Sequence, residues 1–293
     1  MKLIESKVEV IDQLPGLEGV YKQVELAGRT CYKSEDKITE DSAKEFVDRM
    51  IALGHGAMLE HGTVYLKLEG INKSWEYYHV QEYLENNYSK VVIEREGIDS
   101  SDWFEFYITT NLRVLVENNW LDDLQYACEP TAHHEKRISA RFTCDRGVSH
   151  QIVRHRAMSF AQESQRYVGY DKEKFGSEVT FIKPHWYDEE FPVCLTWVEG
   201  LKEAEKKYME LREIGLKPQD ARGVLPNATK TEIVVTGFES DWKHFFELRT
   251  SGAAHPDMRK LAINLKEQLY GFDEKTEGYG ESAGTNDVTS TAA

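Results

Sequence analysis

The stretch ISARFTCDRGVSHQIVRHRAMSFAQESQRY, residues 138–167, carries the clearest structural pattern of the chain. Its first eight residues alternate apolar with polar side chains, which predicts a strand over 138–145 with Cys144 on the buried face. After an Arg-Gly turn, the apolar spacing of VSHQIVRHRAM predicts a helix over 148–158. We therefore expect a strand that leads directly into a helix, with polar residues following it.

Further elements are predicted on both sides of this stretch. A strand is expected at TVYLKL (63–68), because apolar and polar residues alternate there, and a third strand is expected at TKTEIVVTG (229–237). Helical spacing and end signals predict helices over 41–53, 198–214 and 256–271, and a short helix that begins at Pro218. A further helix is predicted with Ser240 as its N-cap; it carries Trp242, Phe245, Phe246 and Arg249. We expect Trp242, Phe245 and Phe246 to lie in the core. The order is not a regular βαβ series, which favours an α+β fold with a central, mainly antiparallel sheet flanked by helices.

The chain is interpreted as one domain over residues 1–272, with two distinct segments. Residues 72–135 are rich in aromatics and amides without a clean period, apart from a short helical pattern in NLRVLVENNW, and we interpret them as an insertion packed on the domain. Residues 273–293 are small and polar, which predicts a disordered tail.

Composition excludes several classes of protein. A net charge of −15 disfavours nucleic acid and anionic membranes as partners. No apolar run is long enough to span a membrane, and the N-terminal residues lack a secretory apolar stretch. The four cysteines form no CxxC pair, as expected of reduced thiols in a cytoplasmic protein rather than of a disulfide scaffold or a zinc ribbon.

Arginines concentrate between residues 137 and 166. This window holds six arginines, no lysine and two acids, so its charge is +4, and −19 remains for the other 263 residues. A basic pocket in an acidic protein suggests a small anionic ligand, and arginine rather than lysine favours bidentate recognition of phosphate or a carbonyl. The alternative is that these arginines form ion pairs with the acidic surface.

The order of residues within this window indicates which kind of anionic ligand the arginines could bind. On a helix, Arg154 and Arg156 would point to nearly opposite sides, so they would serve two ligands or two subunits. Ser164, Gln165 and Arg166 then offer a hydroxyl, an amide and a guanidinium, a plausible lining for a nucleotide base and its phosphate.

The run RHRxxSxxxxSxRY at 154–167 resembles the signature of the flavin-dependent thymidylate synthases. Further likenesses lie in ELAGRTCYKS, LEHGTVYLKL, FTCDRGVSHQIVRHR, DARGVLPNATKTEIVVTG and WKHFFELRTSGAAHPDMRKLA, and within the insertion in YSKV and TTNLRVL, as in a longer-chain subgroup. The resemblance spans about residues 20–70 and 136–270. It implies synthesis of dTMP from dUMP, with methylenetetrahydrofolate as carbon donor, NADPH as reductant, FAD as cofactor, and a homotetramer that shares its active sites between subunits.

The resemblance also implies roles for particular residues. Arg249 matches the arginine that polarises the uracil, a catalytic role. Flavin contacts are implied for His61, Thr63, Arg154, His155, Arg156, Gln162 and His244. Substrate contacts are implied for Gln151, Arg154, Gln162, Ser164, Gln165, Arg166, Arg222 and Arg249.

The chain departs from the family pattern at three places. Ala161-Gln162 stands where many members have Asn-Glu, and Phe238 and His244 stand where asparagines often contact the flavin. Gln162 lacks the charge, His244 can replace an amide hydrogen bond, and Phe238 offers only a ring face. No cysteine lies in an activating setting, and we assign Cys144 to the core. The flavin route needs no cysteine nucleophile.

Other classes of function remain as alternatives. A nucleotide- or RNA-binding module would keep the arginine pocket but need no flavin, and an inactive relative of the synthase would keep the fold. A metal-dependent hydrolase built on His55, Glu60 and His61 is disfavoured, because no HExxH motif or matching third ligand is present. We therefore expect no metal site.

Overall fold

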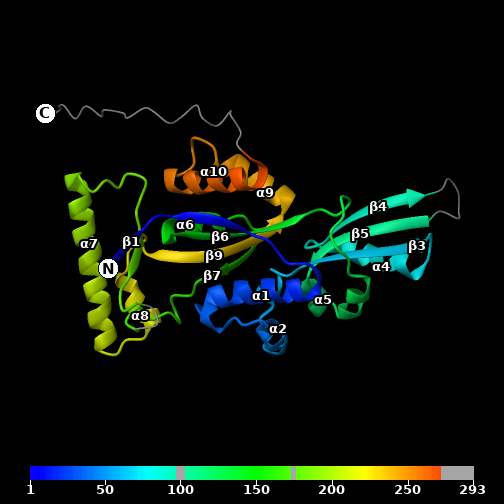
Figure 1. Ribbon diagram of the computed structural model, residues 1–293, viewed down its shortest axis with the longest axis horizontal. Coiled ribbons are helices and arrows are strands. Elements are labelled where there is room, and N and C mark those ends of the chain that lie inside the picture. Colours follow the sequence, from blue (N-terminus) through cyan, green and yellow to red (C-terminus); the bar gives the residue numbers. More distant parts are fainter. Residues whose placement is uncertain (97–102, 173–175, 272–293) are drawn as a thin grey trace.

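A four-stranded antiparallel sheet lies at the centre of the molecule (Figure 1). The computed structural model describes residues 1–96, 103–172 and 176–271. The strand order is β2 (Lys7–Ile11), β6 (Arg137–Asp145), β9 (Lys230–Phe238) and β7 (Ser159–Gln162). The strands predicted at 138–145 and 229–237 are confirmed as β6 and β9, and so are the α+β class and the antiparallel sheet.

Helices cover both faces of this sheet (Figure 1). On one face lie α6 (Arg146–Ile152), α9 (Glu239–Arg249) and α10 (Pro256–Tyr270); on the other lie α1 (Gly16–Tyr32) and α2 (Ser42–Ala52). Phe142 of β6 packs against Trp242 and Phe245 of α9 within one buried cluster, to which Phe246 also belongs. The core assignment of these three aromatic residues and of Cys144 is confirmed. The helices expected at 41–53 and 256–271 are α2 and α10.

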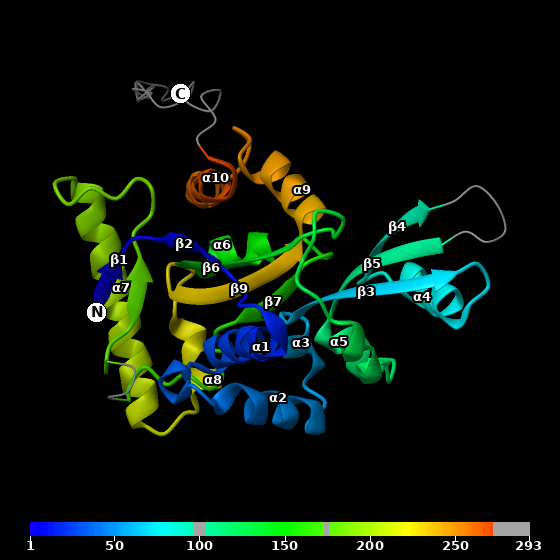
Figure 2. The same cartoon turned by 45° about the vertical axis from the view of Figure 1, so that its right-hand side comes forward.

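A second sheet is built largely from the segment 72–135 (Figure 2). Its antiparallel order is β3 (Thr63–Ile71), β5 (Trp103–Asn111) and β4 (Lys90–Glu96). Helices α4 (Trp75–Glu85) and α5 (Leu112–Glu117), with η2 (Leu121–Tyr126), pack on it, and α3 (Gly56–Leu59) leads into β3. The strand expected at 63–68 is confirmed as β3. One apolar cluster joins this sheet to α1 and α2, so the segment extends an existing core.

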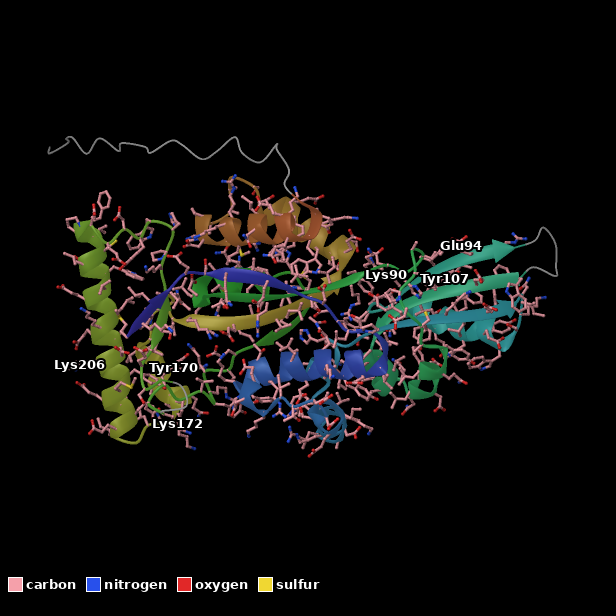
Figure 3. The ribbon with its side chains drawn as sticks, in the orientation of Figure 1. Lys90, Glu94, Tyr107, Tyr170, Lys172 and Lys206 are labelled. Carbon is pink, nitrogen blue, oxygen red and sulfur yellow. The ribbon has the colours of Figure 1, made fainter. Side chains whose placement is uncertain are left out.

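Lys90 connects the second sheet to the central sheet through polar contacts. Figure 3 shows Lys90 at the end of β4 that faces the central sheet, with Glu94 farther along the strand. Its ammonium group donates to Glu135 (3.2 Å) and to the hydroxyl of Ser240 (2.5 Å), and it lies 4.7 Å from the centre of the Phe238 ring. The two sheets are therefore held together by polar contacts as well as by apolar packing.

The opposite end of the molecule carries a third small cluster. Strands β1 (Lys2–Ile4) and β8 (Thr180–Ile182) pair in parallel beside α7 (Pro192–Glu213), α8 (Pro218–Ala221) and η4 (Arg222–Val224), and η1 (Glu35–Lys37) follows α1. Phe181 of β8, Leu201 and Tyr208 of α7, and Tyr170 meet in one buried group. Figure 3 places Tyr170 beside α8 and Lys206 on α7. The short helix expected from Pro218 is confirmed as α8.

The helix predicted over 148–158 is wrong in its second half. α6 ends at Ile152, residues 153–158 form turns, and β7 begins at Ser159. Two tertiary contacts override the helical pattern: the Arg249 guanidinium donates to the last-turn carbonyl of Gln151 (2.9 Å), and Ser159 is aligned with Thr236 of β9. Arg154 and Arg156 therefore lie in a loop, and not on the helix whose opposite sides they were predicted to face.

Two helix starts also differ from expectation. α7 begins at Pro192 rather than near residue 198; Val193 and Leu195 are exposed there, so the first turn has no apolar periodicity. α9 begins at Glu239, and the carboxylate of Asp241, not Ser240, accepts the N–H of Phe238 (3.1 Å). Residues 273–293, predicted to be disordered, lie outside the described residues. Among the described helices, none combines the length and apolar character that a membrane span requires.

Candidate active site

Arg249 joins three of the predicted site residues into one hydrogen-bonded group. From the last turn of α9, its Nε donates to Nε2 of His155 (3.0 Å), and its Nη1 and Nη2 donate to Oε1 (3.4 Å) and the backbone carbonyl (2.9 Å) of Gln151. Residues from the end of α6 and from the 153–158 loop are thereby held against α9. The group presents a fixed guanidinium, an amide and an imidazole side by side.

The imidazole of His155 is neutral in this group. Its Nε2 accepts a hydrogen bond from Arg249, so it carries no proton there. Burial, the Arg249 charge and the nearby His244 lower the pKa of His155 to about 4. The His244 ring lies 6.3 Å from the His155 ring and remains exposed. The sequence separates these three residues by up to 94 positions, and the fold brings them together.

Most arginines of the 137–166 window make no ion pair. Arg141 alone among them contacts a carboxylate within the described residues, that of Glu9 on β2. Arg154, Arg156 and Arg166 are exposed, and no acidic side chain lies within ion-pairing distance in the described parts of the chain. The alternative in which these arginines serve to pair with the acidic surface is therefore wrong for five of the six.

Arginines that form no ion pair also affect one another. Arg154 lies close enough to Arg249 that its charge, together with burial, lowers the pKa of Arg249. Arg222, at the end of α8, likewise lowers the pKa of Arg146 after burial does. Like charges held near each other create a positive potential that a bound anion would relieve. Arg146 was not assigned a role from the sequence; its only signal is its place in the arginine-rich window.

Ser164, Gln165 and Arg166 lie in the turn after β7. The N–H of Ser164 donates to the Cys31 carbonyl at the end of α1 (3.0 Å), and its Oγ accepts from the Arg166 N–H (3.4 Å). Gln165 is buried, whereas the guanidinium of Arg166 extends over the exposed Tyr167 ring at 5.6 Å. The turn thus offers a fixed hydroxyl and an accessible cation.

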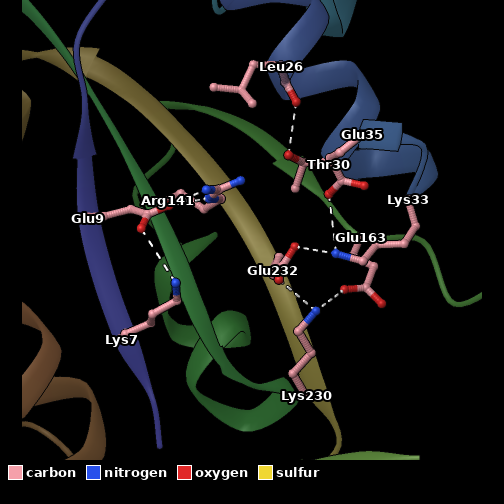
Figure 4. Close-up of polar contacts among 10 residues, drawn as sticks. All are labelled: Lys7, Glu9, Leu26, Thr30, Lys33, Glu35, Arg141, Glu163, Lys230 and Glu232. Atoms are coloured by element: carbon pink, nitrogen blue, oxygen red, sulfur yellow. Dashed lines mark hydrogen bonds and ion pairs between the residues drawn. The ribbon is translucent and has the colours of Figure 1, made fainter. Parts of the chain in front are cut away.

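A buried ion network holds the base of this turn (Figure 4). The Glu163 carboxylate is 3% exposed and lies 2.9 Å from the Lys230 ammonium; Lys230 also contacts Glu232 (2.9 Å), and Glu232 contacts Lys33 (2.7 Å). Burial alone would raise the pKa of Glu232, but the charges of Lys230 and Lys33 outweigh it and lower the pKa to about 2. The sequence predicted no role for these residues, because their pairing joins α1, β7 and β9.

His61 and Thr63 lie in the interior, apart from the Arg249 group. The His61 ring is fully buried, and its Nδ1 lies 2.9 Å from Oγ1 of Thr236. Burial and the charge of Arg137 lower the pKa of His61 to about 3. The Thr63 hydroxyl accepts from Arg137 (3.4 Å). Their assignment to flavin binding stays a prediction; Thr63 lines a cavity, whereas the His61 ring is covered by the fold.

Gln162 and Phe238 are also engaged within the chain. The Gln162 amide donates to Ser149 (2.8 Å) and Thr231 (3.2 Å), so the uncharged side chain serves to join β7 to α6 and β9. The Phe238 ring is 7% exposed and lies beneath Lys90 and Arg137. In the described residues no cluster of three or more histidine, cysteine or acidic side chains could hold a metal ion.

The chain has an α+β fold whose surface carries three arginines, Arg154, Arg156 and Arg166, that contact no carboxylate within the described residues. Residues 129–272 match the family model described as "Thymidylate synthase complementing protein". The flavin-dependent thymidylate synthase of Pyrococcus furiosus is 34% identical over 151 residues, which cover 52% of this chain and 61% of that protein. The same enzyme from Corynebacterium aurimucosum is 26% identical over 263 residues, covering 84% of this chain and 74% of the relative.

These matches support membership in the flavin-dependent thymidylate synthase family. It spans less than two thirds of the length of the archaeal relatives that it matches. Among solved structures, a UMP/dUMP methylase, PolB from Streptomyces cacaoi bound with 5-Br UMP, covers 92% of this chain and 91% of its own at 16% identity and a TM-score of 0.43.

Proposed function

We propose that this protein is a flavin-dependent thymidylate synthase that makes dTMP from dUMP in the cytoplasm. Methylenetetrahydrofolate would donate the carbon, and NADPH would reduce the bound FAD. The observation that carries the proposal is the set of unpaired arginines: in a chain of net charge −15, Arg154, Arg156, Arg166, Arg222 and Arg249 contact no carboxylate in the described structure. Leaving cations unpaired in an acidic protein favours a site for an anionic ligand.

Arg249 is the residue proposed to act on the uracil. Its guanidinium is held by Gln151 and His155, so it would meet the substrate in a fixed orientation. A fixed cation facing the pyrimidine carbonyls would stabilise the negative charge that develops as the ring becomes nucleophilic. Ser164 and Arg166 are proposed to bind the nucleotide by its polar groups and phosphate, together with Gln165 and Arg222.

The residues of the 153–158 loop fit an anionic cofactor. Arg154 and Arg156 are exposed donors without partners, and His155 supplies a neutral ring between them. These three residues would hold FAD, with His244 beside them. Bound flavin would supply the reducing equivalents that convert the transferred methylene into a methyl group. Gln162, whose amide already bonds Ser149 and Thr231, would contribute through the position of β7.

A homotetramer with shared sites is part of the proposal. In one subunit the Arg249 group and the Ser164–Arg166 turn belong to different surfaces, reached from α9 and from the end of α1 respectively. A second subunit that supplies one surface to the other would complete the site. Size-exclusion chromatography with light scattering tests this part, with a mass about four times 33.8 kDa as the expected result.

The absorption spectrum of the purified protein, before and after anaerobic NADPH, tests the proposed function. We expect a flavin band that NADPH bleaches, and faster bleaching when dUMP is present. A protein that cannot be loaded with FAD but binds dUMP would instead be a nucleotide-binding module. A protein that is bleached without forming dTMP would be an inactive relative.

A further inference from the structure

The segment 72–135 reaches the proposed flavin site by two routes. The first is a cavity of about 770 Å³, within the usual range for small-molecule sites, which Thr63 lines together with residues 124–130 of the segment. The second is Lys90 at the start of β4, whose ammonium group lies 4.7 Å from the centre of the Phe238 ring. No residue of the segment has a role in the proposed function.

Two cations lie against the ring of Phe238. One is Lys90, and the other is Arg137, which is aligned with Phe238 across β6 and β9 and lies 5.4 Å from the ring centre. Cations over a ring face are attracted by the ring quadrupole. The ring is 7% exposed, so these contacts and the surrounding packing fix its position. The carboxylate of Asp241 is engaged by the N–H of Phe238 (3.1 Å).

Only one of the two cations is paired with a carboxylate. Glu135 accepts from Lys90 (3.2 Å) and from the N–H of Ser240 (3.3 Å). Burial alone would raise the pKa of Glu135, but hydrogen bonds from Lys90 and Ser240 outweigh it and lower that pKa. Within the described residues no carboxylate lies within 4 Å of Arg137, and its buried Nε has no hydrogen-bond partner. The surroundings of Phe238 therefore favour a negatively charged group.

We propose that Lys90 is a positioning residue of the flavin site, supplied by the segment 72–135. Through the ring of Phe238 and the hydroxyl of Ser240 it holds the start of α9, and with Arg137 it keeps this wall positive. A positive wall stabilises reduced flavin more than oxidised flavin, because the reduced ring can lose a proton and become an anion. The inference rests on the proposed function, and it gives a role to Phe238, one of the departures from the family pattern.

Two substitutions with opposite expected effects test the proposal in the FAD-loaded full chain. Lys90→Met removes the charge, so the affinity for reduced relative to oxidised FAD should fall about tenfold, which lowers the midpoint potential by about 30 mV. Glu135→Gln keeps an acceptor for Lys90 but removes its counter-charge, so the potential should rise. Lys90→Arg keeps the charge and should stay near the wild-type value. Spectroelectrochemical titration measures the potential, and no turnover is needed.

Lys67→Met is the matched control. Lys67 lies on β3 of the same sheet, 5.6 Å from the ring centre of Tyr107, and it pairs with Glu105 (2.6 Å). It therefore has the same kind of surroundings as Lys90, a ring and a carboxylate, but at a different ring. The midpoint potential of Lys67→Met should equal that of the wild-type protein.

Three results would overturn the proposal. The first is an unchanged potential in folded, FAD-loaded Lys90→Met. The second is a shift of the same sign in Lys90→Met and Glu135→Gln, as expected if both changes only disturb the packing between the two sheets. The third is an equal shift in Lys67→Met. Should Lys90→Met fail to fold, an unchanged or lowered potential in Glu135→Gln serves the same purpose.

Failure of this inference and failure of the proposed function give different results. A wild-type protein that takes up no FAD would contradict both. A wild-type protein that binds FAD, with a potential that does not respond to Lys90, would contradict this inference alone.

Discussion

The Nε of Arg249 donates a 3.0 Å hydrogen bond to Nε2 of His155. This contact sets the protonation state of His155: its Nε2 must be unprotonated to accept the N–H of Arg249. An arginine proposed to polarise the substrate is thus oriented by a histidine proposed to contact the flavin. One hydrogen bond therefore connects the residue proposed to act on the substrate with the residue proposed to bind the cofactor.

Replacing Arg249 tests the proposed role in polarising the uracil. We expect Arg249→Ala to fold and bind FAD but to lose at least about 100-fold in the rate of dTMP formation, the scale seen when a charge-stabilising donor is removed. Arg249→Lys would recover little, because one ammonium cannot reach both Gln151 and His155. Arg49→Ala, on the exposed face of α2, is the control and should keep normal turnover. Near-normal turnover in Arg249→Ala would show that Arg249 does not polarise the uracil.

Arg166 is expected to recognise the phosphate of the nucleotide. Its guanidinium is exposed and unpaired beside Ser164, so it is free to meet an anion. Arg166→Gln should weaken dUMP binding by about tenfold or more while leaving the binding of deoxyuridine unchanged. Equilibrium binding of both ligands measures this ratio, and Arg212→Gln, which removes an arginine paired with Asp171, is the control. Equal losses for the two ligands would argue against phosphate recognition.

The Glu163–Lys230 pair is expected to support both stability and substrate binding. Lys230→Met would leave the buried Glu163 carboxylate without its partner, at a cost of about 3 kcal/mol or more in the free energy of unfolding. The adjoining turn would loosen, so we expect a raised KM for dUMP with a smaller change in kcat. Lys243→Met, at an exposed pair, should change neither quantity. If urea unfolding gives Lys230→Met a free energy of unfolding within about 0.5 kcal/mol of the wild-type value, the ion network does not contribute to stability.

The buried His61 makes stability depend on pH. Its pKa is about 3 in the folded chain and about 6.5 when unfolded, so the unfolded state binds more protons as the pH falls between these values. The free energy of unfolding should therefore fall by about 2 kcal/mol from pH 7 to pH 5 on account of this residue. His61→Asn should remove that part of the loss, whereas His133→Asn, at an exposed position, should keep it. If the free energy of unfolding falls equally with pH in His61→Asn and in the wild-type protein, the prediction is contradicted.

Cys144 is expected to be dispensable for catalysis. The side chain is fully buried on β6, and burial raises the pKa of its thiol. Cys144→Ala should cost about 1 kcal/mol of stability and keep dTMP formation. Loss of turnover in a variant that is folded and FAD-loaded would point to a thiolate mechanism instead.

Local patterns were enough to predict β3, β6, β9 and the aromatic core residues of α9, but not the other strands or the path of the RHR loop. Alternation in 138–145 predicted β6 correctly, because one face of this strand is buried against α9 and α10. The strand predicted at 229–237 is β9, which is buried on both faces. The helical spacing in 148–158 predicted a helix that is too long. The Arg249 side chain and the edge of β9, both remote in sequence, decide where α6 ends. Tertiary contacts of this kind leave no local signal.

The same limit applies to the candidate site. Clustering of arginines in the sequence predicted a pocket for an anion, and the absence of ion pairs at Arg154, Arg156 and Arg166 agrees with that expectation. The engagement of Gln162 with Thr231 and the cover of Lys90 over Phe238 could not be predicted, since each joins residues at least 69 positions apart. Side-chain chemistry was readable from the sequence, whereas partners across the fold were not.

The most direct test is the formation of dTMP by the purified protein from dUMP, methylenetetrahydrofolate, NADPH and FAD, measured by liquid chromatography. We predict dTMP that appears with time, requires FAD and NADPH, and is nearly abolished in Arg249→Ala. An FAD-loaded wild-type protein that is reduced by NADPH and binds dUMP, yet forms no dTMP, would contradict the proposed synthase activity.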